Sequence, residues 1–326
     1  MKHLFLRTLA VGMAALLIGG AGTAMADVRL KLGHVGPPTH PFQTGALKLA
    51  ELAHEYSKGE ITIDVFPASQ IGNERDLVEG ARMGTVDMLL TSTGPVMGFD
   101  ARFGVLDIPY IFRDAKHAHR VLDGEVGDEL FKSLEAKGLK GLAWFENGFR
   151  DTINSKRPIN SPADMEGLKI RSIENPIHVA YFKKLGANPL PMAWGELYPA
   201  LEKKVVDGAD SPIGAIVTAR LYEVQKYLSM TSHIYSGVPV LMSMRKYKSL
   251  SPEHRAVLVK AAREAATFER DLLAQQDEEG IAALQKNGME IVKPDLEPFM
   301  AVGRAVQQEF ADKTDPGLLK KILASQ

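Results

Sequence analysis

The chain has 326 residues, of which 45% are hydrophobic and 24% are charged, a balance typical of a globular protein. Its formal net charge of −1 argues against nucleic acid or an anionic membrane surface as the main partner. The sequence contains no cysteine, which excludes disulfide bonds and thiolate metal sites. The length predicts about two domains.

The first 26 residues have the pattern of a secretory signal peptide. Lys2 and Arg7 supply a positive start, and the apolar run LAVGMAALLIGG is too short to span a membrane comfortably. The Ala-Met-Ala sequence that ends at Ala26 resembles a signal-peptidase site. Because a lipid anchor would need a cysteine at the cleavage point, we expect cleavage near Ala26 and a soluble, periplasmic protein.

The first half of the remaining chain alternates predicted strands with predicted helices. Apolar residues in period two predict strands in VRLKLGHV and ITIDVFP, and an apolar strand follows in TVDMLLTST. The helix between the first two strands has one apolar face, formed by Phe42, Ala46, Leu49, Ala53 and Tyr56. A second helix, in IGNERDLVEGARMG, has Asn73 as its N-cap and Asp76 three residues later. This order of elements predicts a parallel sheet covered by helices.

The same order returns in the second half. Ser161 is the expected N-cap in SPADMEG, strands are predicted in GLKIRSI and NPLPMA, and helices in HVAYFKKLG and GELYPALEKK. LVEGARMGTVDMLL and YPALEKKVVDGADS echo each other, which indicates two similar α/β halves. Further strands are predicted in KYLSMTSHIYSGVPVLMSM and GMEIVKPDLEPF, and a long helix begins after the N-cap Ser251. A chain that crosses between two halves several times predicts a hinge.

The sequence lacks the motifs of nucleotide binding and of nucleophilic catalysis. No GxGxxG or GxxxxGKS/T motif follows a predicted strand, and no GxSxG elbow occurs. His117 and His119 form an HxH pair, but residues two positions apart on a helix do not share a face. We interpret this pair as part of a solvated helix surface. We expect no catalytic constellation, no metal site and no cofactor.

Two arginines follow or lie within predicted strands and are candidates for binding an anion. Arg150 follows GLAWFENGF, and Arg171 lies in GLKIRSI. A guanidinium group is always charged and can hold a carboxylate with two hydrogen bonds. The residues alone leave two alternatives open. Each arginine pairs with a local acid at a sheet edge, which is the simpler interpretation, or both face one cleft and share an external carboxylate.

Other candidates lie at the ends of predicted strands, where open α/β sheets bind their ligands. Trp194 follows one strand and begins a helix, and it is either a core aromatic or part of such a cleft. Asp210 and Ser211 follow the next strand. Glu74 lies in the first turn of its helix, where the helix dipole favours a carboxylate in any case.

An ordered series of motifs resembles one family of transport proteins. The series is FPASQIGNERDLVEGARMGTVDM, LDIPYIF, ENGFRDTINSKRPI, MEGLKIRSIENP, GANPLPMAWGELYPALEKKVVDG and LYEVQKYLSMTSH. It is similar to the extracytoplasmic solute-binding proteins of tripartite ATP-independent periplasmic (TRAP) transporters, of the DctP type. The resemblance extends from about Val28 to the C-terminal helix.

This resemblance implies a two-domain α/β periplasmic-binding-protein fold. It would have mixed, mainly parallel sheets, crossing hinge strands and a long helix that spans the hinge. The implied divisions are a signal peptide at 1–26, domain I at 27–148 and 236–275, domain II at 149–235 and 276–305, and a C-terminal helical segment at 306–326. The resemblance also implies that the protein delivers its ligand to the small and large subunits of a membrane permease. We expect a monomer, which suits a diffusing carrier.

The resemblance assigns expected roles to the candidate residues. Arg171 would form the salt bridge to the substrate carboxylate, Arg150 would assist, and Trp194 would line the ligand. Glu74 is a polar contact in some members of the family. The remaining candidates for substrate binding are Asp210, Ser211, Ser92, His34 and Tyr235.

Two departures from the family pattern affect the expected ligand. Ser211 replaces an asparagine that often binds ligand, and Ser92 and Pro95 stand where the sialic-acid branch has a glutamate and an arginine. Sialic acid is therefore not expected. The expected ligands are C4-dicarboxylates, hydroxy or oxo acids, and hexuronates. The alternatives are a secreted α/β enzyme acting on a small organic acid and a binding protein that feeds a chemoreceptor.

Overall fold

The computed structural model describes residues 27–325. The predicted signal peptide and its cleavage site near Ala26 lie outside these residues. Among residues 27–325, no helix combines the length and the apolar character needed to cross a membrane.

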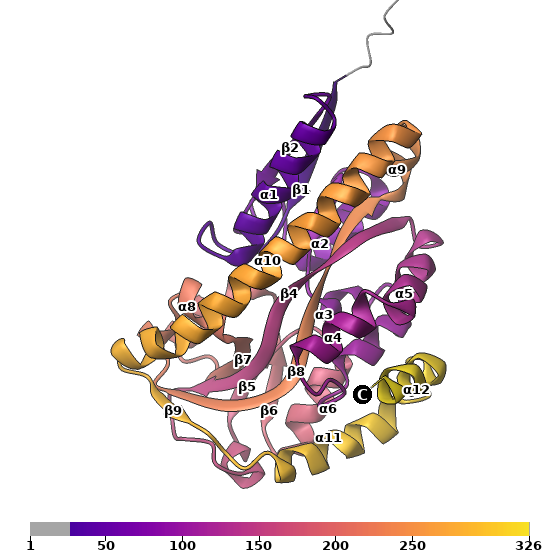
Figure 1. The fold of residues 1–326 in the computed structure, drawn as a ribbon. Helices are drawn as coiled ribbons and strands as arrows, with labels where there is room; N and C mark the ends of the chain where they lie inside the picture. Colours follow the sequence, from indigo (N-terminus) through magenta and orange to yellow (C-terminus); the bar gives the residue numbers. More distant parts are fainter. Residues whose placement is uncertain (1–26, 326) are drawn as a thin grey trace, which may run out of the picture.

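A single mixed sheet of nine strands organises the described chain, in the order β2-β1-β3-β8-β4-β7-β5-β6, with β9 beside β8 (Figure 1). The strands are β1 (Val28–Gly33), β2 (Ile61–Phe66), β3 (Met88–Leu90), β4 (Leu139–Asn154), β5 (Lys169–Ser172), β6 (Asn188–Pro191), β7 (Gly208–Pro212), β8 (Tyr227–Ser243) and β9 (Glu290–Val292). Five of the eight pairings are parallel. The predicted mixed, mainly parallel arrangement is therefore confirmed.

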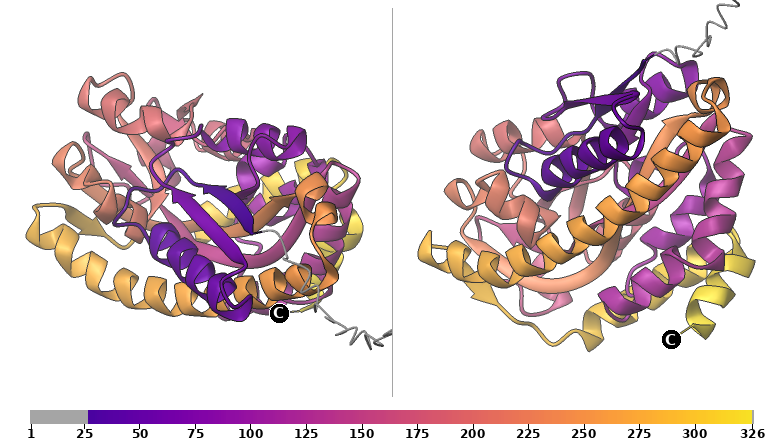
Figure 2. Two further views of the ribbon diagram at one scale, coloured as in Figure 1. Left: turned by 90° about the horizontal axis from the view of Figure 1, so that it is seen from above. Right: turned by 45° about the horizontal axis from the view of Figure 1, so that its top comes forward.

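The helices cover this sheet, and α1, α2, α4, α6, α7 and α10 lie in segments predicted as helical. The strand predicted in GMEIVKPDLEPF is wrong in its second half, where α11 begins. They are α1 (Pro41–Tyr56), α2 (Glu74–Met83), α3 (Thr93–Val96), α4 (Ala115–Leu122), α5 (Glu125–Glu135), α6 (Pro176–Lys184), α7 (Trp194–Glu202), α8 (Ile213–Thr218), α9 (Met244–Ser249), α10 (Pro252–Lys286), α11 (Glu297–Phe310) and α12 (Pro316–Ala324). Three short 3₁₀ helices cover Ala101–Asp107, Pro162–Met165 and Leu221–Glu223. Figure 2 shows α1 lying against β2 and beside α10.

The long strands β4 and β8 join the two ends of the sheet. They pair with each other along most of their length, while β8 also pairs with β3 at one end and β4 pairs with β7 at the other. The register shifts between Glu146 and Gly148, as at a β-bulge. Gly148 has a φ of 93°, a conformation that a residue with a Cβ rarely adopts. The bulge thus bends β4 near its middle.

The expected domain boundaries relate to these elements in two ways. In the ladder between β4 and β8, Gly148 pairs with Ser236, and the next pair is Phe149 with Tyr235. The predicted boundaries at 148/149 and 235/236 both fall between these two pairs. The divisions at 275/276 and 305/306 fall inside α10 and α11. The crossing strands and the 35-residue α10 are present, and the division into two domains stays a prediction.

Strand β4 contributes to each of three hydrophobic cores, which explains its central position. Phe145 joins the core between β1, β2, α1 and α10, and Trp144 joins the core under α4, α5 and the C-terminal helices. Ile153 joins the third core, beneath α7 and α8. A bend in β4 therefore changes how these cores lie relative to one another.

Two predicted helix caps are confirmed by their hydrogen bonds. The Asn73 side chain accepts from the Asp76 backbone N–H, and the Asp76 carboxylate accepts in return from the Asn73 backbone N–H. This capping box fixes the start of α2 and so the position of Glu74, its first residue. The Ser251 hydroxyl accepts from the His254 backbone N–H at the start of α10.

The interpretation of His117 and His119 as a solvated surface is wrong for His117. Its ring is fully buried, because α12 covers this part of α4 and its Nε2 lies 3.3 Å from the Ile322 carbonyl oxygen. His119 is partly buried and lies 2.7 Å from Glu146. The described residues contain no group of three or more histidine, aspartate or glutamate side chains placed to hold a metal ion.

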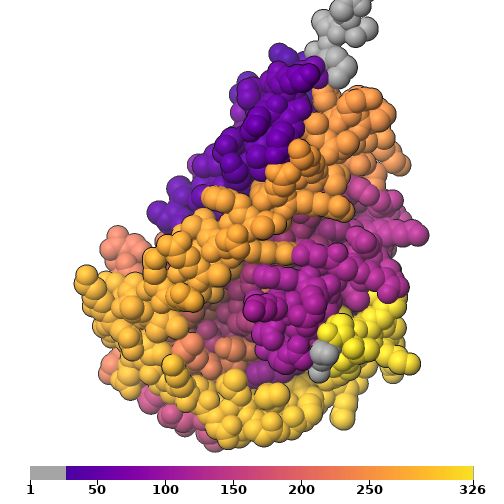
Figure 3. Space-filling model, viewed as in Figure 1, coloured from indigo at the N-terminus to yellow at the C-terminus, as the bar shows by residue number. Residues whose placement is uncertain are grey.

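A groove of about 630 Å³ runs between α10 and the sheet, and its wall contains two carboxyl groups that resist ionisation. Figure 3 shows α10 crossing this face of the molecule beside α4 and α5. Burial raises the pKa of both Asp151 and Asp277 to about 7. Asp277 also lies near Glu146, whose charge raises its pKa further, while a hydrogen bond from the Gly214 backbone N–H acts in the opposite direction.

Replacing Asp277 by asparagine should stabilise the protein at pH 8 and change little at pH 4. The folded state binds the Asp277 proton more tightly than the unfolded state does, so its contribution to stability is complete below the ordinary pKa of 3.8. That contribution is lost as the pH rises through about 7. Because the side chain is only partly buried, we expect Asp277→Asn to raise the free energy of unfolding by about 1–2 kcal/mol at pH 8. Urea unfolding measures this change. The exposed Asp271 on the same helix gives the control, Asp271→Asn. Equal shifts for the two variants would contradict the expectation.

Candidate functional site

A small cavity lies where the carboxyl ends of several strands meet the first turns of helices. Its volume is about 40 Å³. Six of the predicted residues line it: Glu74, Ser92, Arg150, Arg171, Trp194 and Ser211. They come from the start of α2, the end of β3, the middle of β4, the end of β5, the start of α7 and the end of β7. Residues at the ends of several strands thus meet in one cavity, as the sequence predicted.

Arg171 is buried in the cavity wall without an acidic partner. Its side chain is 2% exposed. Its Nε and Nη2 both donate to the Met192 carbonyl oxygen, at 3.0 and 2.8 Å, and its guanidinium carbon lies 5.9 Å from the centre of the Trp194 ring. Within residues 27–325, no carboxylate lies at ion-pair distance from this guanidinium. A buried cation of this kind is costly until an anion reaches it.

The pKa of Arg171 reflects its burial and the nearby charges, none of which forms an ion pair with it. Burial, together with the nearby positive charge of Arg150, lowers the pKa to about 10, although the negative charges of Asp210, Glu74 and Glu174 act in the opposite direction. The side chain therefore remains charged at neutral pH, in a site that favours the arrival of a negative group.

Arg150 has a different environment, because it forms a buried ion pair within the protein. Its Nε lies 2.5 Å from Asp210 Oδ2, and its Nη2 donates to the Asp210 carbonyl oxygen at 2.7 Å. Arg150 is 3% exposed and Asp210 is fully buried. The alternative left open by the sequence, pairing with a local acid at a sheet edge, fails for Arg171. Arg150 does pair with an acid, but this acid is buried on the neighbouring interior strand β7.

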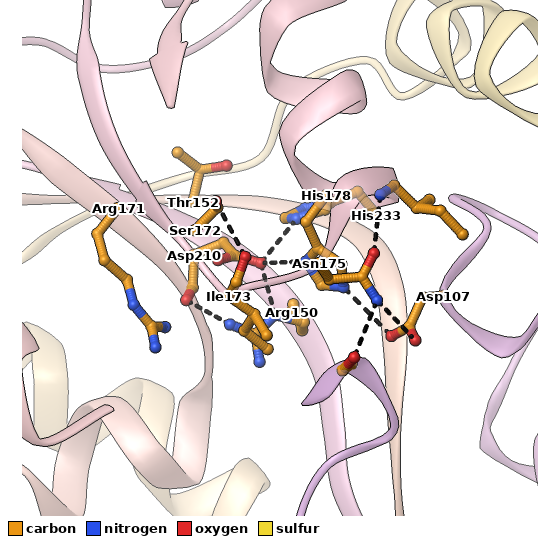
Figure 4. Close-up of polar contacts among 12 residues, drawn as sticks. Asp107, Arg150, Thr152, Arg171, Ser172, Ile173, Asn175, His178, Asp210 and His233 are labelled. Carbon is orange, nitrogen blue, oxygen red and sulfur yellow. Dashed lines mark hydrogen bonds and ion pairs between the residues drawn. The ribbon is translucent and has the colours of Figure 1, made fainter. Parts of the chain in front are cut away.

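Behind Arg150, a chain of buried polar groups balances its own charges (Figure 4). Asp210 Oδ2 lies 3.6 Å from His178 Nδ1 and 3.4 Å from His233 Nε2, and His178 Nε2 lies 3.2 Å from Asp107. Burial would raise the pKa of Asp210, but the positive charge of Arg150 and the two nearby histidines hold it well below its usual range. Burial lowers the pKa of His178, but the two carboxylates outweigh this effect and raise it. Arg150 and the two carboxylates, with both histidines between or beside them, thus form one buried polar network.

Ser211, another predicted polar residue at a strand end, is among the residues that line the cavity. The side chain is fully buried, and its Oγ has no hydrogen-bond partner among the described residues. Glu74 is partly exposed, and its Oε2 lies 3.5 Å from the Trp194 backbone nitrogen. Ser92 is the N-cap residue of α3.

Three predicted site residues do not line the cavity. Tyr235 lies opposite Phe149 in the ladder, and its ring packs 5.3 Å from Phe149 and 5.4 Å from Phe112 in the core. Because side chains alternate along a strand, this face of the sheet is not the one that Arg150 occupies. His34 is buried beside the cavity, and its Nε2 lies 2.9 Å from Gln43 Oε1. Asp210 also lies behind the wall and reaches the cavity only through Arg150.

Seven lining residues were missed from the sequence: Val35, Gly36, His40, Phe42, Asn147, Ile173 and Ala215. His40 is the N-cap of α1, and the proline after it could have marked this position. Its Nδ1 accepts from the Phe42 backbone N–H, and burial lowers its pKa to about 3, so the ring is neutral. Asn147 lies at the register shift of β4, where the simple alternation of faces fails.

Comparison with known proteins agrees with this geometry. The family model described as bacterial extracellular solute-binding protein, family 7, matches residues 32–314. The chain is 39% identical to the 2,3-diketo-L-gulonate-binding periplasmic protein YiaO of Escherichia coli, over 94% of this chain and 96% of the relative. It is 35% identical to the C4-dicarboxylate-binding periplasmic protein DctP of Rhodobacter capsulatus, over 85% and 84% of the two chains.

Solved structures give the same result. A TRAP periplasmic solute-binding protein from Polaromonas, bound to D-erythronate, aligns with a TM-score of 0.89 and 38% identity, covering 91% of this chain and 98% of that one. A second, from Bordetella, with density interpreted as pantoate, aligns with a TM-score of 0.89 and 36% identity, covering 92% and 99%. The chain therefore belongs to bacterial extracellular solute-binding protein family 7, the family of the solute-binding subunits of TRAP transporters.

Proposed function

We propose that this protein captures a small organic carboxylate in the cavity at Arg171 and delivers it to a TRAP membrane permease. One observation carries the proposal: Arg171 is buried, charged and unpaired, while the neighbouring Arg150 already has Asp210. Proteins rarely retain a buried charge without a partner. A ligand carboxylate would supply the missing partner and two charge-assisted hydrogen bonds.

The residues around Arg171 are assigned roles by their positions. Trp194 would cover the ligand beside the guanidinium, and Ser211 and Ser92 would offer hydroxyl groups to it. Arg150 would act mainly by shaping the wall, since Asp210 occupies its donors. The relatives named above for 2,3-diketo-L-gulonate and C4-dicarboxylates support an organic acid as the ligand class.

The mechanism we propose is hinge closure without chemistry. The bulge of β4 near Gly148 and the paired part of β8 would form the hinge between domain I (27–148 and 236–275) and domain II (149–235 and 276–305), and α10 would span it. The mature protein would act as a periplasmic monomer after cleavage near Ala26, and it would hand the acid unchanged to the two permease subunits.

The proposal is tested by titrating organic acids into the purified protein. Trp194 lines the cavity, whereas Trp144 is stacked on Phe131 in the core, with ring centres 4.5 Å apart. A bound acid should therefore change the tryptophan fluorescence, and the change should persist in Trp144→Phe but vanish in Trp194→Phe. Nuclear magnetic resonance of the recovered acid should show no product. Turnover of the acid, or no response to any organic acid, would contradict the proposal.

A further inference from the structure

Resting on the proposed function, we infer that Asp107 is a positioning residue for domain closure. Its carboxylate, in domain I, receives hydrogen bonds from Asn175 and His178 of domain II when the two domains close on the acid. A contact of the protein with itself thereby helps to hold the ligand cavity shut. We call it the closure contact, and it consists of Thr93, Gly94 and Asp107 on one side and Ile173, Asn175 and His178 on the other.

The hydrogen bonds of the closure contact cross the predicted domain boundary at 148/149. Asn175 Nδ2 donates to Asp107 Oδ2 and to the Gly94 carbonyl oxygen, each at 3.3 Å. His178 Nε2 lies 3.2 Å from Asp107 Oδ1 (Figure 4). Both donors belong to the first turns of α6 or its N-cap, so they move together with that helix.

Asp107 needs these donors because it is 1% exposed. Within domain I, its carboxylate accepts a hydrogen bond from Thr93 Oγ1 at 3.0 Å. A buried carboxylate is costly unless its oxygens are hydrogen-bonded. Without Asn175 and His178, closure would bury Asp107 with too few partners, and the closed form would lose stability relative to the open form.

The hydrogen bond from His178 is strengthened by charge. Its Nδ1 lies 3.6 Å from Asp210, so each ring nitrogen faces a carboxylate oxygen, as suits a ring that carries both protons. Burial opposes the charge, but the two carboxylates raise the pKa of His178 above its ordinary value of 6.5. A charged donor on a carboxylate gives a stronger hydrogen bond than a neutral one.

The two sides of the closure contact also meet closely beside the cavity. A Cβ at Gly94 would lie 2.9 Å from Ile173 Cγ2, which is closer than real side chains pack. Ile173 lines the cavity, as does Ser92, two positions before Gly94. Glycine at position 94 therefore permits an approach of the two sides that a larger residue would prevent.

Domain closure can be measured directly because the chain contains no cysteine. Cysteines introduced by Met83→Cys in domain I and Val205→Cys in domain II, at positions 66% and 52% exposed, carry spin labels. Electron paramagnetic resonance then measures the distance between the labels. D-Erythronate, succinate and D-glucuronate are titrated in turn, and the acid that binds most tightly by calorimetry is used below. It should replace a longer distance by a shorter one.

Asn175→Ser removes a donor of the closure contact but keeps the helix cap. Asn175 Oδ1 accepts from the Ile177 backbone N–H, and a serine hydroxyl can do the same. We expect the acid to bind about three- to tenfold more weakly, with a smaller closed fraction at equal acid concentration. The control is Asn154→Ser. Asn154 is equally buried and donates to the Arg157 carbonyl oxygen, but within domain II, so this change should lower stability and leave affinity unchanged.

Gly94→Ala tests the close approach without changing any polar group. The added methyl group would overfill the contact in the closed form, so the acid should bind at least about fivefold more weakly. Alanine favours a helix more than glycine does, so the free energy of unfolding without ligand should not fall. Gly195→Ala, in α7, is the control, because its methyl group would enter open space and should leave affinity unchanged.

The outcomes separate this inference from the proposed function. If an acid binds and closes the native protein, and either Asn175→Ser or Gly94→Ala keeps native affinity, the proposed function stands and the inference fails. A loss of stability in ligand-free Gly94→Ala as large as its loss of affinity would show that the contact persists in the open form, and would also overturn it. If no acid binds the native protein, or if binding leaves the distance unchanged, capture by hinge closure fails and the inference falls with it.

Discussion

Replacing Arg171 by alanine is expected to weaken ligand binding by roughly 30-fold or more. Removing one partner of a buried, hydrogen-bonded charge pair typically costs about 2–5 kcal/mol, and Arg171 is the only cation of the described cavity wall that lacks an internal carboxylate. Titration calorimetry with the acid that binds the native protein measures the effect. Arg171→Lys should also bind weakly, because an ammonium group loses the two-pronged geometry of a guanidinium group.

The same change should not destabilise the protein without ligand. Arg171 has no acidic partner to lose, so its removal relieves a buried charge, and the free energy of unfolding should stay equal or rise. The control is Arg157→Ala, since Arg157 also donates to backbone carbonyls but is exposed and lies outside the cavity. Native ligand affinity in Arg171→Ala would contradict the assigned role.

Replacing Arg150 by methionine should instead destabilise the fold, by about 3–5 kcal/mol at pH 7. Methionine fills a similar volume but leaves Asp210 buried with only the histidines as partners. Because the pKa of Asp210 is held well below its ordinary value of 3.8, its contribution is present above that pH. The difference between variant and native protein should therefore narrow as the pH falls below about 3.8.

Urea unfolding as a function of pH measures this effect, and Arg157→Met serves as the exposed control. A stability loss below about 1 kcal/mol, as is typical of exposed ion pairs, would contradict the buried pairing. Arg150→Met and Arg171→Ala thus have opposite signatures: the first affects mainly stability, the second mainly binding.

Most elements of the fold could be predicted from local patterns. The period-two strands at the start of the chain, the Asn73 capping box and the Ser251 cap all depend on residues close in sequence, so the sequence contained the information. His117 was misjudged because its burial depends on α12, which lies about 200 positions further along the chain. Contacts of that range leave no local signal.

The site was predictable at its strand ends and unpredictable within β4. Arg171, Trp194 and Ser211 follow the rule that ligands bind at the carboxyl ends of strands. Asn147 depends on a bulge, and Tyr235 faces the core because of its register with Phe149. The pairing of Arg150 with Asp210 joins residues 60 positions apart, and spacing alone could not distinguish it from a free arginine.

The position of the ligand carboxylate in a crystal of the complex tests the central claim most directly. The account predicts that its oxygens lie about 2.7–3.2 Å from the guanidinium nitrogens of Arg171, with the Arg150–Asp210 pair intact. A carboxylate bound to Arg150 with Asp210 displaced, or a ligand seated in the groove beneath α10, would contradict it.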